Sequence, residues 1–510
     1  MRSGWAYADR VTSARTTGTL PEQVEVFIVG AGFAGLGAAI KLAESGEQDF
    51  LCIDRGAEVG GTWRDNSYPG ATCNVPSQLY SFSFALNPDW SRSFSPQPEI
   101  QQYLRRVAAE SGVLDRFRFG VTFESASWDA ASARWRIETS AGPTIARLLV
   151  SAAGSLSEPN LPAIDGIERF AGELFHSACW DHQAELAGRR VAVIGTGASA
   201  IQIVPAIADQ VDRLDVYQRT PPWVLPRRER AYHRWERWAL RRLPLLQRLA
   251  RSLVYLAREA TVGMFIAYPR IGRLVSRGAI ANIRRSITDP GLRAKLLPDY
   301  ALGCKRVLLS NDWYPTLARP NVELITEPIA RITEHGIVTA DGRERPADVL
   351  VVATGFRPTE PPIADRIRNG PGRTLAEAWT VDGLQAYKGS TVSGFPNLFL
   401  LIGPNTALGH SSMVFIAESQ ISYLIDAHRT MKRQRLATVE PLPEIQRAWN
   451  ADLQRRMTRT VWNTGCRSWY LDRHGRNVTL WPRTSYAFRR LTARFDLAAY
   501  RSTPLPAVPG

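Results

Sequence analysis

The chain has 510 residues, 45% of them apolar and 22% charged, which is typical of a folded chain of several domains and excludes a disordered one. Five cysteines, none in a CxxC pair, exclude a disulfide-dense scaffold and a zinc finger, and no metal site is expected. The net charge of +15 suits a polyanion, an anionic membrane or an anionic cofactor.

The two ends of the chain carry no targeting signal. The segment 1–20 contains arginines but no apolar stretch, so no signal peptide is predicted. No uncharged apolar run is long enough to span a membrane. We therefore expect a cytoplasmic protein without integral membrane association. Residues 502–510 contain three prolines and are expected to form a loose tail.

A nucleotide-binding pattern begins near the N-terminus. Residues 24–29 predict a buried parallel strand, a helix follows to about Ser45, and a second strand over residues 50–53 ends at Asp54. A glycine turn in between would bring backbone N–H groups to a pyrophosphate at the helix N-terminus. The acid can accept a hydrogen bond from a ribose hydroxyl. The turn consists of Gly30, Gly32, Phe33, Ala34 and Gly35.

The same pattern recurs in the middle of the chain. Residues 190–194 predict a strand, Gly195 and Gly197 open the turn, and Ala200 takes the third small position. The segment from Gly195 to Arg219 has the same length as the segment from Gly30 to Asp54. Because the second unit ends in an arginine, which suits a 2′-phosphate, we expect NADPH there and FAD in the first unit.

The remaining segments suggest two domains. Strands over 148–154 and 349–356 are interpreted as chain crossings between them. The predicted fold is α/β, with two Rossmann-like dinucleotide-binding domains: an FAD domain of residues 20–157 and 358–510, and an NADP domain of residues 158–357. Residues 227–299 lack strand character and predict a helical insertion in the NADP domain.

The insertion carries a dense basic face over residues 227–258. We favour a solvated helix face. A weak peripheral contact with a membrane or an acidic partner is the alternative, with an apolar side formed by Trp235, Trp238, Leu243, Leu245 and Leu246. No nucleic-acid-binding signature accompanies these helices, so nucleic acid is not an expected partner.

Two motifs carry a family resemblance. Phe170, Gly172, His176, Trp180 and Asp181 match FxGxxxHxxxW[P/D], just before the second glycine turn. This pattern resembles the fingerprint of type I Baeyer–Villiger monooxygenases, in the flavin-containing monooxygenase superfamily. Residues 60–74 match a second family motif except at its last position, where the family has Asp and this chain has Asn74. Further matches at 303–306, 394–410 and 465–470 extend the likeness to about residues 22–485.

The resemblance implies an NADPH-dependent flavoprotein, and we expect the protein to be a monomer. It would insert one atom of O2 beside the carbonyl of an apolar small-molecule ketone through a C4a-peroxyflavin, giving an ester or lactone. The alternatives are N- or S-oxygenation, or another oxidation caused by Asn74. A disulfide reductase is disfavoured because Cys52 and Cys73 are too far apart in the sequence to form a redox pair of the usual spacing. A non-catalytic nucleotide-binding or membrane-associated protein also stays open.

The resemblance also implies roles for individual residues. Arg306, always protonated, would stabilise negative charge on oxygen. Asn74 would either strengthen that effect or leave Arg306 misplaced and the enzyme leaky. His176 is expected to act through conformation rather than proton transfer. Arg219 and Lys305, with Thr220 nearby, would hold the 2′-phosphate.

Other cofactor contacts are expected from segments around the two turns and the later motifs. The substrate pocket is expected between the domains, lined by the helical insertion and by loops 380–415 and 460–485. The predicted cofactor contacts are Arg55, Thr62, Trp63, Asn74, Val75, Tyr80, Val121, Thr196, Ala198, Ser199, Gln202, Thr354, Gly355, Asn405, Met413 and Trp469.

Overall fold

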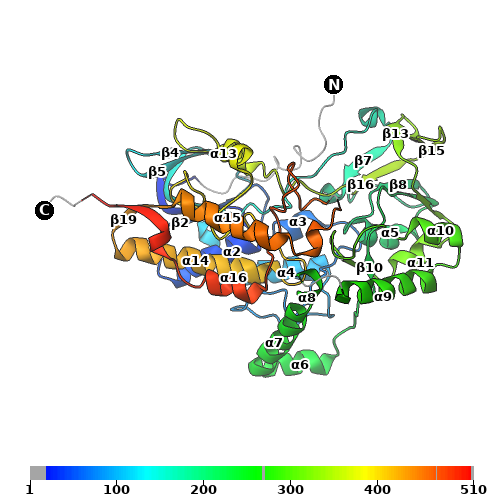
Figure 1. Ribbon diagram of the computed structural model, residues 1–510, viewed down its shortest axis with the longest axis horizontal. Coiled ribbons are helices and arrows are strands. Elements are labelled where there is room, and N and C mark those ends of the chain that lie inside the picture. Colours follow the sequence, from blue (N-terminus) through cyan, green and yellow to red (C-terminus); the bar gives the residue numbers. More distant parts are fainter. Residues whose placement is uncertain (1–18, 267–269, 467, 507–510) are drawn as a thin grey trace.

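The computed structural model describes residues 19–266, 270–466 and 468–506. Two sheets, rich in parallel strands, organise the chain and lie side by side (Figure 1). The larger has the order β17-β4-β5-β6-β1-β2-β3, with β18 also paired to β6. Its strands are β1 (Gln23–Val29), β2 (Phe50–Asp54), β3 (Phe117–Phe119), β4 (Phe123–Asp129), β5 (Arg134–Thr139), β6 (Thr144–Ser151), β17 (Ile367–Arg368) and β18 (Leu398–Leu400).

The centre of this sheet explains the apolar runs in the sequence. Strand β1 lies parallel between β2 and β6, so that Val26 pairs with both Phe50 and Leu148. Strands covered on both faces bury nearly every side chain. Helix α2 (Phe33–Glu44) packs against α14 (Met413–Arg433). Strand β18 beside β6 shows that the C-terminal part completes the N-terminal sheet.

The second sheet contains only parallel pairs, in the order β12-β9-β8-β16-β7. It places β8 and β16, from distant parts of the chain, next to each other. Helix α5 (Ala200–Ile207) and α11 (Trp313–Leu317) pack beside it. Its strands are β7 (Glu173–His176), β8 (Arg190–Ile194), β9 (Arg213–Tyr217), β12 (Val322–Ile325) and β16 (Val349–Val352), and an antiparallel group adds β13 (Ile329–Ile332), β14 (Gly336–Thr339) and β15 (Glu344–Pro346).

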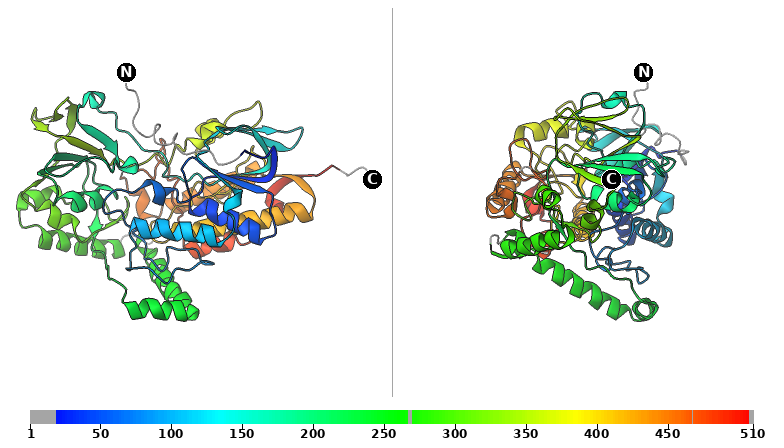
Figure 2. Two further views of the ribbon diagram at one scale, coloured as in Figure 1. Left: turned by 180° about the vertical axis from the view of Figure 1, so that it is seen from behind. Right: turned by 90° about the vertical axis from the view of Figure 1, so that its right-hand side faces the viewer.

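The predicted helical insertion is confirmed. It lies between β10 (Val224–Leu225) and β11 (Leu308–Leu309), which pair with each other. Its helices are α6 (Arg234–Arg242), α7 (Pro244–Ala260), α8 (Gly263–Ile266), α9 (Arg270–Ser286) and α10 (Pro290–Lys295). Helices α6 and α7 project away from both sheets, at the bottom of Figure 1 and of both views in Figure 2.

Shorter elements complete the chain. The remaining helices are α3 (Thr62–Asp65), α4 (Gln97–Glu110), α12 (Ile363–Arg366), α13 (Leu375–Asp382), α15 (Pro443–Met457) and α16 (Ser485–Leu491), with 3-10 turns at Leu114–Arg116, Ile167–Arg169, Ser177–Cys179, Val461–Asn463 and Leu497–Ala499. Strand β20 (Tyr500–Pro504) pairs with β19 (Leu436–Pro441). The expectation of a loose tail is therefore wrong for residues 502–504, because backbone pairing with β19 holds them.

Within the described residues, no helix has the length and apolar character needed to cross a bilayer. The N-terminal segment on which the signal-peptide prediction depends, and residues 507–510 of the expected tail, lie outside the described part of the chain.

Candidate active site

The first glycine turn has the geometry of a pyrophosphate site. Gly30 has a φ of +107°, and a Cβ there would lie 2.5 Å from the carbonyl oxygen of Ala152, so this position requires glycine. A Cβ on Gly32 would meet only the Cα of Gly61, at 3.7 Å. Helix α2 begins without a side-chain cap or an acidic residue in its first turn. Its free N–H groups can therefore bind an anion.

Asp54 lies at the end of β2, buried beside this turn. Its carboxylate accepts hydrogen bonds of 2.7 Å from the N–H groups of Ala31 and Gly56 and pairs with Arg64 at 2.7 Å. These contacts hold the acid at the turn, where a ribose would lie. Arg55 points elsewhere, because its guanidinium pairs with Glu158 at 2.6 Å.

The second turn repeats the first. Gly195 has a φ of +116°, and a Cβ there would meet the carbonyl oxygen of Ala353 at 2.5 Å. A Cβ on Gly197 would have no atom within 4 Å, so space is open above the turn. Helix α5 also begins without a side-chain cap hydrogen bond or an acid in its first turn. Ser199 and Ala198 lie at this open helix start, and Thr196 donates to the carbonyl of Thr220 at 3.3 Å.

The side chains of Arg219 and Lys305 lie near each other beyond the end of β9. Burial lowers the pKa of Lys305, and the positive charge of nearby Arg219 lowers it further. The ammonium of Lys305 lies 4.7 Å from the ring centre of Tyr300. Neither cation takes part in an ion pair with another described residue. Two like charges held together this way are stabilised by a bound anion, and a 2′-phosphate fits.

Aromatic side chains cover the first turn. The indole N–H of Trp63 donates to the hydroxyl of Tyr80 at 2.9 Å, and Tyr80 meets Phe33 edge to face at 5.2 Å. Thr62 opens helix α3 just before Trp63. Val75 is buried near this cluster, and the N–H of Val121 donates to the carbonyl of Asp54 at 3.0 Å. The cluster gives an apolar wall beside the expected flavin site.

Arg306 lies near Cys73 and Tyr80, which are close in the chain to Asn74. The Oδ1 atom of Asn74 is buried and has no hydrogen-bond partner among the described residues, which fits a polar ligand group. Burial raises the pKa of adjacent Cys73 to about 12, and the charge of Arg306 opposes that rise. Arg306 itself is exposed. The structure therefore brings the two residues that the sequence analysis paired into one neighbourhood.

A second arginine, Arg258 of α7, lies near Arg306 and is part-buried. It was not among the residues predicted for the site. Burial lowers the pKa of Arg258, and the charge of Arg306 lowers it further. The Nε–H of Arg258 donates to the carbonyl of His410 at 2.9 Å. Neighbouring Glu259 pairs with the His410 ring at 3.0 Å. The helical spacing of Gln247, Arg251 and Arg258 was the available signal that they share one face of α7.

A disulfide joins two of the predicted segments. Cys304 and Cys466, with Cα atoms 6.2 Å apart and a sequence separation of 162, link the Lys305–Arg306 segment to the loop before Trp469. Burial raises the pKa of Tyr470 to about 12, and Arg306 opposes the rise. Trp469 packs on Tyr470 with ring centres 4.4 Å apart. Because the two cysteines form no short motif, no sequence pattern indicated this link.

His176 lies apart from the cations, at the end of β7. Its Nδ1 accepts from the N–H of Ala178 at 3.0 Å, and its ring meets Phe356 at 6.0 Å. Burial lowers its pKa to about 4, while the backbone of Gly355 opposes this shift. The ring is therefore neutral near pH 7. At the same crossing, the hydroxyl of Thr354 donates to the carbonyl of Asn160 at 2.5 Å.

Other residues of the FxGxxxHxxxW[P/D] motif pack strand β7 against its neighbours. A Cβ on Gly172 would lie 2.3 Å from the carbonyl oxygen of Asp348, so only glycine lets β7 approach the start of β16. Trp180 packs edge to face on Phe175 at 4.9 Å. The motif thus fixes β7 to its neighbour, which agrees with a conformational role for His176.

Three predicted cofactor contacts hold loops together. The side-chain amide of Gln202 donates to the carbonyl of Thr72 at 2.9 Å, which joins α5 to the loop before Asn74. The amide of Asn405 donates to the carbonyls of Asn477 and Leu480 at 2.9 and 3.0 Å. The sulfur of Met413 accepts from the N–H of Leu408 at 3.3 Å. Their direct contact with a cofactor stays a prediction.

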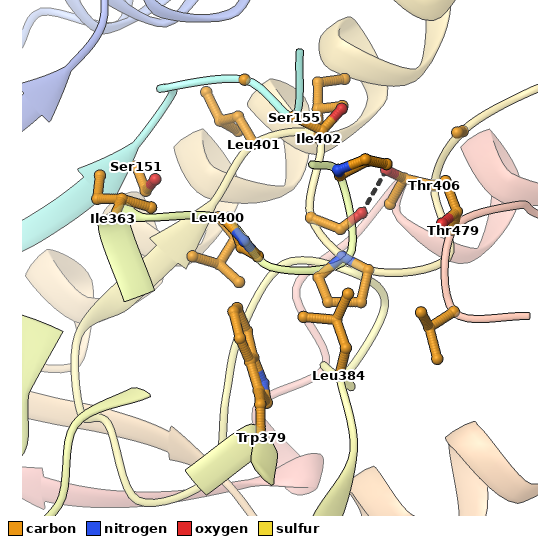
Figure 3. A pocket seen from close by; sticks show the side chains of 17 residues that line it. Ser151, Ser155, Ile363, Trp379, Leu384, Leu400, Leu401, Ile402, Thr406 and Thr479 are labelled. Atoms are coloured by element: carbon orange, nitrogen blue, oxygen red, sulfur yellow. Dashed lines mark hydrogen bonds between the residues drawn. The ribbon is translucent and has the colours of Figure 1, made fainter. Parts of the chain in front are cut away.

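A pocket opens behind the segment of residues 400–407 (Figure 3). Trp379 and Leu384 line it from one side and Leu400 and Thr406 from another. The hydroxyl of Thr406 donates to the carbonyl of Gly403 at 2.6 Å. The lining includes parts of the expected loops but no residue of the helical insertion. No residue of this lining is Arg306, Arg258 or Asn74.

Comparisons with known proteins agree with this geometry. The family model described as flavin-binding monooxygenase-like matches residues 23–267. A Baeyer–Villiger monooxygenase of Streptomyces coelicolor is 50% identical, over 96% of this chain and 95% of its own length. One of Pseudomonas aeruginosa is 46% identical, over 97% and 94%. The solved structure of OTEMO in complex with FAD and NADP is 27% identical, with a TM-score of 0.85 over 94% of this chain and 99% of that one.

Proposed function

Because the chain belongs to the Baeyer–Villiger monooxygenase family, we propose that it oxidises an apolar small-molecule ketone to an ester or lactone, with FAD and NADPH as cofactors and O2 as oxidant. One observation carries the proposal. The charge of Arg306 acts on Cys73, whose neighbour Asn74 has a buried Oδ1 atom without a hydrogen-bond partner among the described residues, in a chain with two glycine turns that open onto helix starts.

The two turns divide the cofactors between them. We assign FAD to the turn at Gly30 with Asp54, and NADPH to the turn at Gly195. Arg219 and Lys305, with Thr220, would hold the 2′-phosphate that distinguishes NADPH from NADH. This assignment corresponds to an FAD domain of residues 20–157 and 358–510 and an NADP domain of residues 158–357.

Bound FAD would supply the chemistry that activates O2, with NADPH as the source of electrons. The protein supplies charge, position and shelter from water. Insertion of oxygen beside a carbonyl develops negative charge on oxygen, and a nearby cation stabilises such charge. Arg306 provides that cation, with Arg258 as a second positive charge near it. Asn74 is neutral, so it does not cancel either charge.

The decisive experiment compares products. Purified enzyme is given NADPH and a panel of cyclic and aliphatic ketones and thioethers, and ester, lactone, sulfoxide and hydrogen peroxide are measured. We expect ester or lactone from ketones. Arg306→Ala should abolish this product while NADPH oxidation continues with release of peroxide. Arg331→Ala, which removes an exposed arginine from β13, is the matched control.

A specific result would contradict the proposal. If the flavin-loaded enzyme formed sulfoxides but no ester or lactone, sulfur oxygenation would replace ketone oxidation as the function.

We further propose a cytoplasmic monomer, for which light scattering should give a mass near 56.7 kDa.

A further inference from the structure

Helix α7 turns its apolar face away from the protein. Leu245, Leu249, Leu253 and Leu256 recur at every third or fourth position, so they lie along one side of the helix. Each of these four residues is between 55% and 77% exposed. A helix on a protein surface normally buries such a stripe against the core. A continuous exposed stripe therefore indicates a contact surface.

The opposite face of α7 is polar and fixed to the body of the protein. The guanidinium of Arg251 donates to the carbonyls of Gln78 and Leu79, both at 3.2 Å, and Tyr255 stacks on Phe415 at 4.9 Å. Arg258 and Glu259 bind His410, as described above. Rolling the helix to bury its leucines would leave these part-buried polar groups unpaired, which is costly. The exposed stripe is thus a stable feature.

Helix α6, which contacts α7, carries further exposed apolar side chains. Trp235 and Trp238, one helical turn apart, are 68% and 60% exposed. We call these two tryptophans and the four leucines of α7 the hairpin patch. Helices α6 and α7 project from the rest of the molecule in Figures 1 and 2, so an extended surface can reach them.

The helices that carry the hairpin patch are rich in positive charge. Residues 234–260 contain seven arginines and two glutamates. Glu236 pairs with Arg230 at 2.7 Å, and Glu259 pairs with His410 at 3.0 Å. Arg234, Arg242 and Arg248 are exposed and join none of the ion pairs formed within the described residues.

Two kinds of partner could cover this patch: a second copy of the chain or an anionic bilayer. A second copy would place the exposed arginines of the two chains near one another, where like charges repel. An anionic bilayer would pair them with phosphates while leucine and tryptophan enter the headgroup region. We propose that the hairpin patch docks α6 and α7 on the surface of a bilayer that contains anionic phospholipid. This proposal does not depend on the oxidation reaction.

Vesicle co-sedimentation of the full-length holoenzyme tests the proposal. One set of vesicles is phosphatidylcholine alone, and the other contains roughly 30% phosphatidylglycerol. We expect at least about tenfold stronger binding to the anionic vesicles, and weaker binding as salt is raised. Arg242→Gln with Arg248→Gln should reduce this preference.

The apolar part is tested separately. The triple variant Leu245→Ser, Leu249→Ser, Leu253→Ser should reduce binding to anionic vesicles about tenfold or more. Val381→Ser is the matched control, since Val381 is 75% exposed on α13, away from the hairpin patch. Unfolding temperature and flavin absorbance verify that every variant is folded.

Several outcomes would overturn the proposal. The first is flavin-loaded wild-type protein that does not sediment with anionic vesicles, or that binds both compositions equally. Another is binding that the arginine variant weakens and the leucine variant does not, which would indicate a polyanion site. A third is a dimer in light scattering that the leucine variant dissociates, which would make the patch a contact between copies. Vesicle binding is measured without ketone, so failure of the proposed oxidation would be recognised separately.

Discussion

Cys304 and Cys466 form a disulfide that joins the segment of the candidate catalytic arginine to the C-terminal loop. Around it, Phe265 stacks on Trp462 with ring centres 5.7 Å apart. The crosslink therefore ties the helical insertion side of the site to residues 461–470. It connects segments of the site that lie far apart in the sequence.

We expect Cys466→Ser to destabilise this region. A crosslink between cysteines with a sequence separation of 162 closes a long loop. Such a crosslink stabilises a fold by about 3 to 5 kcal/mol, chiefly through the unfolded chain. The variant should unfold at a lower temperature and bind NADP+ more weakly, and reductant should have the same effect on the wild type. Cys179→Ser, at a cysteine outside the disulfide, is the control. An unfolding temperature that reductant leaves unchanged would contradict this.

Asn74→Asp should reduce the release of hydrogen peroxide. Arg306 is exposed and makes no ion pair with another described residue, so no described carboxylate fixes its orientation. A carboxylate at position 74 would pair with it and fix its orientation. We expect peroxide release per NADPH oxidised to fall by about threefold or more, equivalent to roughly 0.7 kcal/mol. Unchanged or increased peroxide release would show that Arg306 does not need this partner.

Arg219→Ala should weaken the use of NADPH specifically. A charge-assisted hydrogen bond contributes about 1.5 to 3 kcal/mol, so kcat/KM for NADPH should fall by about 10- to 100-fold. The value for NADH, which lacks the 2′-phosphate, should change little. Lys305→Ala should behave alike, and Arg331→Ala should change neither value. An equal loss with both nucleotides would place the 2′-phosphate elsewhere.

His176 should make the fold sensitive to acid. Its pKa is about 4 in the folded protein and 6.5 ordinarily. Below pH 6.5 the unfolded chain takes up a proton that the folded protein does not bind until pH 4. The contribution of His176 to the free energy of unfolding is therefore fully present above pH 6.5. It falls by roughly 3 kcal/mol as the pH falls toward 4.

His176→Asn removes this ionisation while its side-chain oxygen can still accept from Ala178. Urea unfolding midpoints at several pH values from about 4 to about 7.5 provide the measurement. The variant should lose less stability over this range than the wild type. Parallel curves for the two proteins would show that His176 does not titrate in this range.

Much of the site could be predicted because its requirements are local. A positive φ at Gly30 and Gly195, an open helix start and a charge at the next strand end all lie within one strand–helix–strand unit at each turn. These features follow from backbone geometry, which short segments encode.

Other features depend on contacts between distant segments. The link from Cys304 to Cys466, the pairing of β20 with β19 and the burial of Arg258 beside Arg306 bring together residues that no local pattern connects. The sequence by itself determined two dinucleotide turns, their opposite terminal charges and a basic helical insertion. Only the tertiary structure decided which face of α7 meets the protein, because burial depends on the partners that surround a helix and not on its own periodicity.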